Sequence, residues 1–164
     1  MDRVKSIYRI NAKDIPPIGV APPSQGAAST MSVKMVYGTD TGIMIAQRQQ
    51  GYHSRPHYHD AEQFNYVLDG EIWFFIEEEG FRCVKGDIVR IPRNAVHWTW
   101  VRAEQGCAML EAHTPSLTGD PALAKGGIAM VGLDEVPVQG VTNLWVDHKQ
   151  AAEVERRAVE ADPD

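Results

Sequence analysis

The chain has 164 residues, of which 43% are hydrophobic, 8% aromatic and 23% charged. This is the length of one domain, and the composition excludes a disordered chain, a collagen and a coiled coil. With 16 basic and 22 acidic residues, the formal net charge is −6. Because nucleic acids are bound by clustered lysine and arginine, an acidic chain without a basic stripe is not expected to bind them.

The sequence contains no pattern typical of a membrane or secreted protein. Its longest apolar run, residues 72–76, is far shorter than the roughly 18 residues of a membrane-spanning helix. Residues 1–5 lack the apolar core of a signal peptide. Cys83 and Cys107 stand apart, without a CxxC motif. We expect two free thiols with no role in the site, in a cytoplasmic protein that does not interact with membranes.

Residues 1–30 are expected to form an extended N-terminal arm. Proline pairs at 16–17 and 22–23 block both a regular helix and a central strand. Such an arm can lie over its own chain or over a partner chain, and a frayed tail is the alternative.

Residues 31–146 are expected to form the barrel: short β-prone runs separated by turn residues fill residues 31–115, and beyond them the weaker candidates for short strands are 128–131 and 142–146. Asp69-Gly70 stands between two of these runs and predicts a hairpin, because this dipeptide favours a tight turn. No long helical pattern interrupts the series, so we predict an all-β fold, an antiparallel barrel or sandwich. The main expected strands are 33–38, 42–48, 64–68, 71–76, 81–84, 88–91, 96–101 and 107–113.

Residues 147–164 are expected to form a C-terminal helix and tail. Asp147 is placed to cap the helix, which is predicted to run to Ala161. An apolar stripe at helical spacing supports this prediction: Ala151, Val154 and Ala158.

Four of the six histidines fall between residues 53 and 97. His57 and His59 form an HxH pair, and because alternate residues of a strand share a face, both imidazoles can converge on one ion. His97, on a later predicted strand, can add a third nitrogen, and Gln63 an amide oxygen. Three imidazoles and one oxygen suit one divalent first-row transition metal: Fe, Mn, Ni, Co, Cu or Zn.

The frame around these residues resembles the two motifs of the cupin family. The first motif has a glycine, an HxH pair, a glutamate and a second glycine, and its counterparts here are Gly51, His57, His59, Gln63 and Gly70. The second motif has a glycine, PxG, a histidine and an asparagine, and its counterparts are Gly86, Pro92, Asn94, His97 and Val101. The departures are Gln63, Asn94 and Val101.

The resemblance implies a cupin-type jelly-roll β-barrel whose metal is held by His57, His59, Gln63 and His97. An alternative alignment makes Glu62 the fourth ligand in place of Gln63. A neutral glutamine leaves the site one unit more positive than a glutamate would, which favours an anionic substrate oxygen.

Further site residues are predicted around the metal. His53 is a candidate base or substrate contact, with a surface position as the alternative, and His113 can point into the barrel mouth. Arg48 is expected to be a solvated surface charge. Strand alternation, starting from the metal ligands, places Asn65 and Thr99 on the substrate-binding wall. Further candidates for this wall, whose phase along their strands stays open, are Trp73, Phe75, Met109 and Glu111. For Trp73 and Phe75 the alternative is a position in the apolar core.

Cupins similar to this chain include dioxygenases, lyases, isomerases and cyclases. We therefore expect a mononuclear metalloenzyme acting on a small organic substrate, anionic or aromatic, by O₂-dependent oxygenation or by metal-assisted lyase, isomerase or cyclase chemistry. The alternative is a non-catalytic module that binds a small molecule. Small cupins of this kind pair through an outer sheet, so a homodimer is expected.

Overall fold

The computed structural model describes residues 6–20 and 31–163. Within these ranges it contains 11 strands, two α-helices and one short 3-10 helix. The bounds are η1 Ala12–Asp14, β1 Ile18–Val20, β2 Met31–Tyr37, β3 Gly42–Arg48, β4 His57–Tyr58, β5 Glu62–Ile76, β6 Glu79–Val84, β7 Ile88–Ile91, β8 His97–Trp100, β9 Cys107–Thr114, α1 Pro121–Gly126, β10 Ile128–Ala129, β11 Leu144–Trp145 and α2 Ala151–Ala161.

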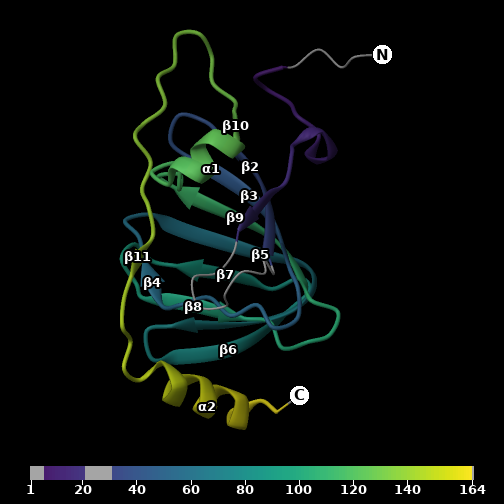
Figure 1. Ribbon diagram of the computed structural model, residues 1–164, viewed down its shortest axis with the longest axis vertical. Helices are drawn as coiled ribbons and strands as arrows, with labels where there is room; N and C mark the ends of the chain where they lie inside the picture. The colour runs from purple at the N-terminus through teal and green to yellow at the C-terminus, as the bar shows by residue number, and fades with distance from the viewer. Residues whose placement is uncertain (1–5, 21–30, 164) are drawn as a thin grey trace.

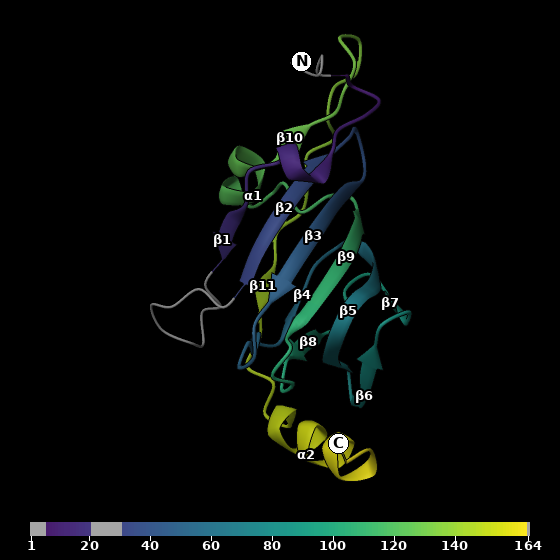
Figure 2. The same cartoon turned by 90° about the vertical axis from the view of Figure 1, so that its right-hand side faces the viewer.

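The strands curl into an open barrel, which confirms the predicted all-β antiparallel architecture (Figures 1 and 2). One side of the barrel, the first sheet, has the order β1-β2-β3-β9-β5-β7. The other side, the second sheet, has the order β6-β5-β8-β4-β11. Among the described strands, the pairing of β10 with β2 is parallel and the others are antiparallel. The long strand β5 takes part in both sides and therefore joins them.

The predicted hairpin at Asp69-Gly70 is wrong. Both residues lie inside β5, which continues through them for 15 residues. Its register against β9 shifts between Val67 and Asp69, so Leu68 forms a bulge directly before the dipeptide, at the bend between the two sides of the barrel. Gly70 has φ +77°, and an added Cβ would collide with the carbonyl oxygen of Gly106. Gly70 is therefore needed for the bend and for the close approach of two strands. A tight turn also requires a positive φ, so the sequence pattern of the two structures is the same.

Two apolar cores lie on opposite faces of the second sheet. Ile72 and Phe74 of β5 belong to the interior core, together with residues such as Val67 and Met109. Trp73 and Phe75 face outward and form a second core with Trp98, under helix α2. The barrel wall is therefore buried on both sides where α2 covers it.

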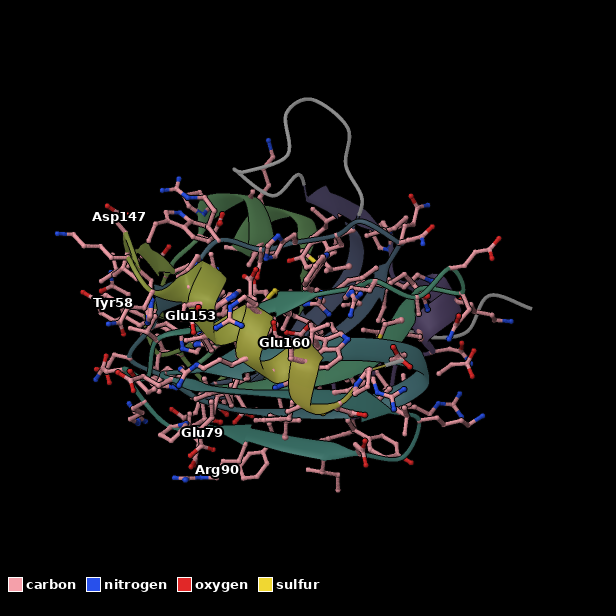
Figure 3. The ribbon with its side chains drawn as sticks, turned by 90° about the horizontal axis from the view of Figure 1, so that it is seen from below. Tyr58, Glu79, Arg90, Asp147, Glu153 and Glu160 are labelled. Atoms are coloured by element: carbon pink, nitrogen blue, oxygen red, sulfur yellow. The ribbon has the colours of Figure 1, made fainter. Side chains whose placement is uncertain are left out.

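Helix α2 lies across the base of the barrel (Figure 3). Val154 and Ala158 are its buried residues, and they pack on the outward aromatic side chains. The Trp98 indole N–H donates to Glu155 Oε1 at 2.7 Å. The helix begins at Ala151, so the predicted start at Asp147 is wrong: Gln150 is the N-cap, without a side-chain capping bond. Helix α2 is therefore held in position by the burial of its apolar stripe and not by a side-chain hydrogen bond at its N-terminus.

The segments before β2 and after β9 add strand β1 to the first sheet and a short helix, α1. In the N-terminal arm, β1 pairs with β2 and so extends the first sheet, while the arm's residues 21–30 lie outside the described ranges. Helix α1, which the sequence pattern did not predict, is capped by the Asp120 side chain accepting from Ala122 N. Neither described helix is long and apolar enough to cross a membrane.

Cys83 and Cys107 are free and buried, which confirms the prediction that they form no disulfide. Burial raises the pKa of each thiol to about 12. Both thiols therefore remain protonated at neutral pH and pack as small apolar groups.

Candidate metal centre

Three histidines converge at one end of the barrel interior. His57 begins β4, His59 follows that strand directly, and His97 begins β8. Strands β4 and β8 pair with His57 opposite His97, and the ring centroids of these two residues are 4.3 Å apart. One ligand nitrogen from each of the three rings lies within 4.8 Å of the others. Tyr58, between the two histidines of the HxH pair, lies at the periphery of the barrel (Figure 3).

The ring orientations direct one lone pair of each histidine toward the centre. In each ring Nδ1 lies beside a backbone carbonyl oxygen two residues away in the chain, at 2.9–3.1 Å. A carbonyl oxygen can only accept, so Nδ1 carries the proton and Nε2 holds the lone pair. Second hydrogen bonds of this kind orient histidine ligands in metal sites. The carbonyls belong to Arg55, Ala61 and Ala95.

Burial keeps the three imidazoles neutral. It lowers the pKa of His57 to about 4, lowers that of His59, and, with the neighbouring His57, holds that of His97 well below its ordinary value. A metal binds only the unprotonated ring, so these histidines are ready to act as ligands at neutral pH.

Gln63 of β5 turns its amide oxygen toward this cluster. Gln63 Oε1 is 3.0 Å from His59 Nε2, while its amide nitrogen donates to Asn65 Oδ1 at 2.8 Å and to Glu111 Oε2 at 3.3 Å. With Nδ1 of His59 protonated, both facing atoms, Nε2 and Oε1, are acceptors. A cation between them would satisfy both, so the donor set fits a divalent transition metal.

The alternative ligand Glu62 is excluded by its direction. Adjacent residues of a strand point to opposite faces, and Gln63 faces the interior. Glu62 Oε1 instead accepts from Arg90 Nε at 2.7 Å on the outer surface.

The centre opens into a cavity of about 370 Å³. The inward-facing side chains of β5 and β9 stand in opposed pairs there, with Gln63 opposite His113 and Asn65 opposite Glu111. Most of the predicted substrate-binding residues line this cavity, and His113, predicted as catalytic, lies among them: Asn65, Thr99, Met109, Glu111 and His113.

His113 is a buried, neutral imidazole close to the histidine cluster. It is 2% exposed, and its ring centroid is 5.5 Å from that of His59. Burial lowers its pKa to about 4, and its Nδ1 has no hydrogen-bond partner among the described residues. His113 can therefore accept or donate a proton in the cavity.

Three predicted site residues lie outside the cavity. Trp73 and Phe75 belong to the core under α2, so their placement on the cavity wall is wrong. The bulge in β5 reverses the alternation that Gln63 begins, and Phe74 lines the cavity instead. His53 is also outside it: its Nε2 lies 2.9 Å from Glu155 Oε1, and its ring stacks on Trp100.

The structure adds cavity residues that the sequence reasoning missed. Arg48 is 7% exposed and pairs with Glu111, so its prediction as a surface charge is wrong. The alternation of β3, with Met44 and Ala46 also buried, was the available signal. Trp145 of β11 pairs with the His57 position and packs against its ring, with centroids 5.1 Å apart. No local pattern indicated this distant contact.

Comparison with known proteins identifies the fold. Residues 44–113 match the family model described as "Cupin domain", and no curated protein sequence matches the chain. A cupin-2 domain from Rhodospirillum rubrum superposes with a TM-score of 0.62 at 11% identity, over 93% of this chain and 89% of its own.

Two further solved structures share the fold at low identity. The polyketide cyclase RemF from Streptomyces resistomycificus has a TM-score of 0.58 at 16% identity, with 73% of this chain and 97% of that chain covered. A cupin-superfamily sugar phosphate isomerase from Silicibacter pomeroyi has a TM-score of 0.56 at 19% identity, with 65% and 74% covered.

Proposed function

We propose that this chain, which belongs to the cupin family, is a mononuclear divalent-metal enzyme that acts on a small organic anion by metal-assisted proton transfer, the chemistry of lyases, isomerases and cyclases. The observation that carries the proposal is the position of His113, a neutral buried imidazole in the cavity of the three-histidine centre.

The charges of the cavity favour an anionic substrate. Three neutral imidazoles and one amide leave the two positive charges of a divalent ion uncompensated. The buried carboxylate of Glu111 is already paired with Arg48 at 2.7 Å. An anionic oxygen of the substrate would supply the missing charge, and a cavity of about 370 Å³ limits that substrate to a small molecule.

The proposed chemistry divides between the metal and His113. A divalent ion bound here would polarise a carbonyl or carboxylate oxygen as a Lewis acid. His113 would take a proton from the adjacent carbon and return it to another position, because its low pKa keeps the base form populated at neutral pH. The shared fold of a cyclase and an isomerase supports this reaction class.

Proton exchange in D₂O tests this function. Protein loaded with zinc, which has no redox chemistry, should exchange a carbon-bound proton of at least one compound in a panel of small hydroxy-, oxo- and aromatic carboxylates, followed by NMR. His113→Asn should reduce the exchange rate at least about 100-fold without changing zinc content. The matched control is His53→Asn, outside the cavity, which should keep the rate.

Two outcomes would contradict the proposal. Turnover that requires iron, consumes O₂ and survives His113→Asn would make the protein an oxygenase. Stoichiometric binding of a panel compound without exchange or turnover, under any metal, would make it a non-catalytic binding module.

We also propose that the outer face of the first sheet forms a homodimer interface. Phe64, Tyr66 and Ile88 are 44%, 42% and 70% exposed. Tyr66 pairs with Ile88 across β5 and β7 and with Leu110 across β9, so these side chains form one continuous apolar patch. An exposed patch of this kind is typical of an interaction surface.

Light scattering at tens of micromolar protein tests the dimer. The wild type should have twice the mass of the chain, and Tyr66→Glu should give a monomer, because it places a charge in the apolar patch. Leu133→Glu, at an exposed apolar residue away from the patch, should remain dimeric. A monomeric wild type would refute the interface.

A further inference from the structure

We propose that Glu111, held in place by Arg48, is a positioning residue that sets the direction of the Gln63 amide, and that residue 63 is an amide because residue 111 is a carboxylate. The metal-binding part of this inference rests on the proposed metal centre. The coupling between the two side chains follows from the hydrogen bonds of the chain itself.

The anchor is a buried ion pair between neighbouring strands. Arg48 Nη2 on β3 donates to Glu111 Oε1 on β9 at 2.7 Å, and the side chains are 7% and 5% exposed. A buried arginine needs a negative partner, since an uncompensated buried charge is costly. Glu111 is therefore ionised, and an ionised carboxylate can only accept hydrogen bonds.

The second oxygen of this carboxylate, Glu111 Oε2, determines which end of the Gln63 amide faces Glu111. Glu111 Oε2 is 3.3 Å from Gln63 Nε2, and Asn65 Oδ1 lies 2.8 Å from the same nitrogen. If the amide were reversed, its oxygen would face the ionised carboxylate of Glu111 without a hydrogen between them. The nitrogen must lie on this side, so the oxygen is directed toward His59 Nε2 at 3.0 Å.

A carboxylate at position 63 would not fit beside Glu111. It would bring two negative groups together in a buried site, so one of them would have to take up a proton. Exchanging the two residue types removes the conflict. An amide at 111 can accept from Arg48 and donate to the new carboxylate at 63, and Asn65 Nδ2, which has no partner among the described residues, can turn to donate as well.

Four proteins test the coupling: the wild type, Gln63→Glu, Glu111→Gln and the double variant. Zinc binding to the metal-free proteins is measured by calorimetry and their unfolding by urea at pH 7.5. Glu111→Gln alone should weaken zinc binding about 10- to 100-fold, because its amide nitrogen reverses Gln63. The double variant should recover most of that affinity. Without metal, Glu111→Gln should destabilise the wild type but stabilise the Gln63→Glu protein.

The effect of Glu111→Gln on the free energy of unfolding must have opposite signs in the wild type and in the Gln63→Glu protein. Additive effects in both measurements, or wild-type zinc affinity in Glu111→Gln, would overturn the inference. If Glu111→Gln alone does not fold, comparison of Gln63→Glu with the double variant still tests the coupling, because the double variant keeps one carboxylate in this buried cluster. Glu62→Gln removes an exposed charge next to Gln63 and should change neither measurement. A wild type without zinc affinity would refute the metal centre, and the unfolding comparison would still test the coupling.

Discussion

Replacing His57 or His97 with alanine is expected to remove most of the bound metal. The two residues face each other across β4 and β8, and each directs an Nε2 lone pair to the centre. Removing a residue that only hydrogen-bonds to a metal ligand already weakens metal binding about 10- to 100-fold. Removing a ligand itself should therefore weaken metal binding by more than about 100-fold. Metal content after dialysis, and calorimetric titration with zinc, measure the loss.

His53→Ala is the control for these variants. It removes a histidine from the same region of the chain, but one that lies outside the cavity beside Glu155. It should bind metal as the wild type does. The metal centre is refuted if His57→Ala and His97→Ala also retain wild-type affinity for Fe, Mn, Ni and Zn.

The metal-free protein is expected to lose stability as the pH falls from about 6.5 to about 4. Burial holds the pKa of His57 and of His113 at about 4 in the folded state, below the ordinary 6.5. Between these values the unfolded chain binds more protons than the folded chain, so acid favours unfolding. At about 1.36 kcal/mol per pH unit, the drop for His113 corresponds to about 3 kcal/mol across this window.

Urea unfolding of the metal-free protein between pH 4 and 7.5 measures this dependence. Above about pH 7.5 these histidines are mostly neutral in both states, so their contribution should level off. His113→Phe keeps a buried ring of similar size without the titrating nitrogen. In this variant the slope of the unfolding free energy against pH should correspond to about one fewer proton taken up on unfolding. A free energy of unfolding that does not change between pH 4 and 6.5 would contradict the prediction.

The fold class and the convergence of His57, His59 and His97 could both be predicted from the sequence. Residue spacing carried this information, because a HxH pair on a strand and a histidine after a tight turn keep their relative positions in any barrel of this kind. Asn94, which replaces the motif glycine, has φ +62°, so the departure preserves the turn that precedes His97. The inward direction of Asn65, His113 and Glu111 likewise follows from alternation along strands with regular pairing.

Beyond the bulge in β5, the side chains that face the cavity could not be predicted from the sequence pattern. Alternation is a local rule that holds until the register shifts. Because of the shift between Val67 and Asp69, Phe74 faces the cavity, whereas Trp73 and Phe75 face outward. The Arg48–Glu111 pair is equally non-local, since it joins residues 63 positions apart that become neighbours only when β3 pairs with β9. Strand register and long-range pairing are properties of the assembled sheet, so no pattern within a single strand could predict them.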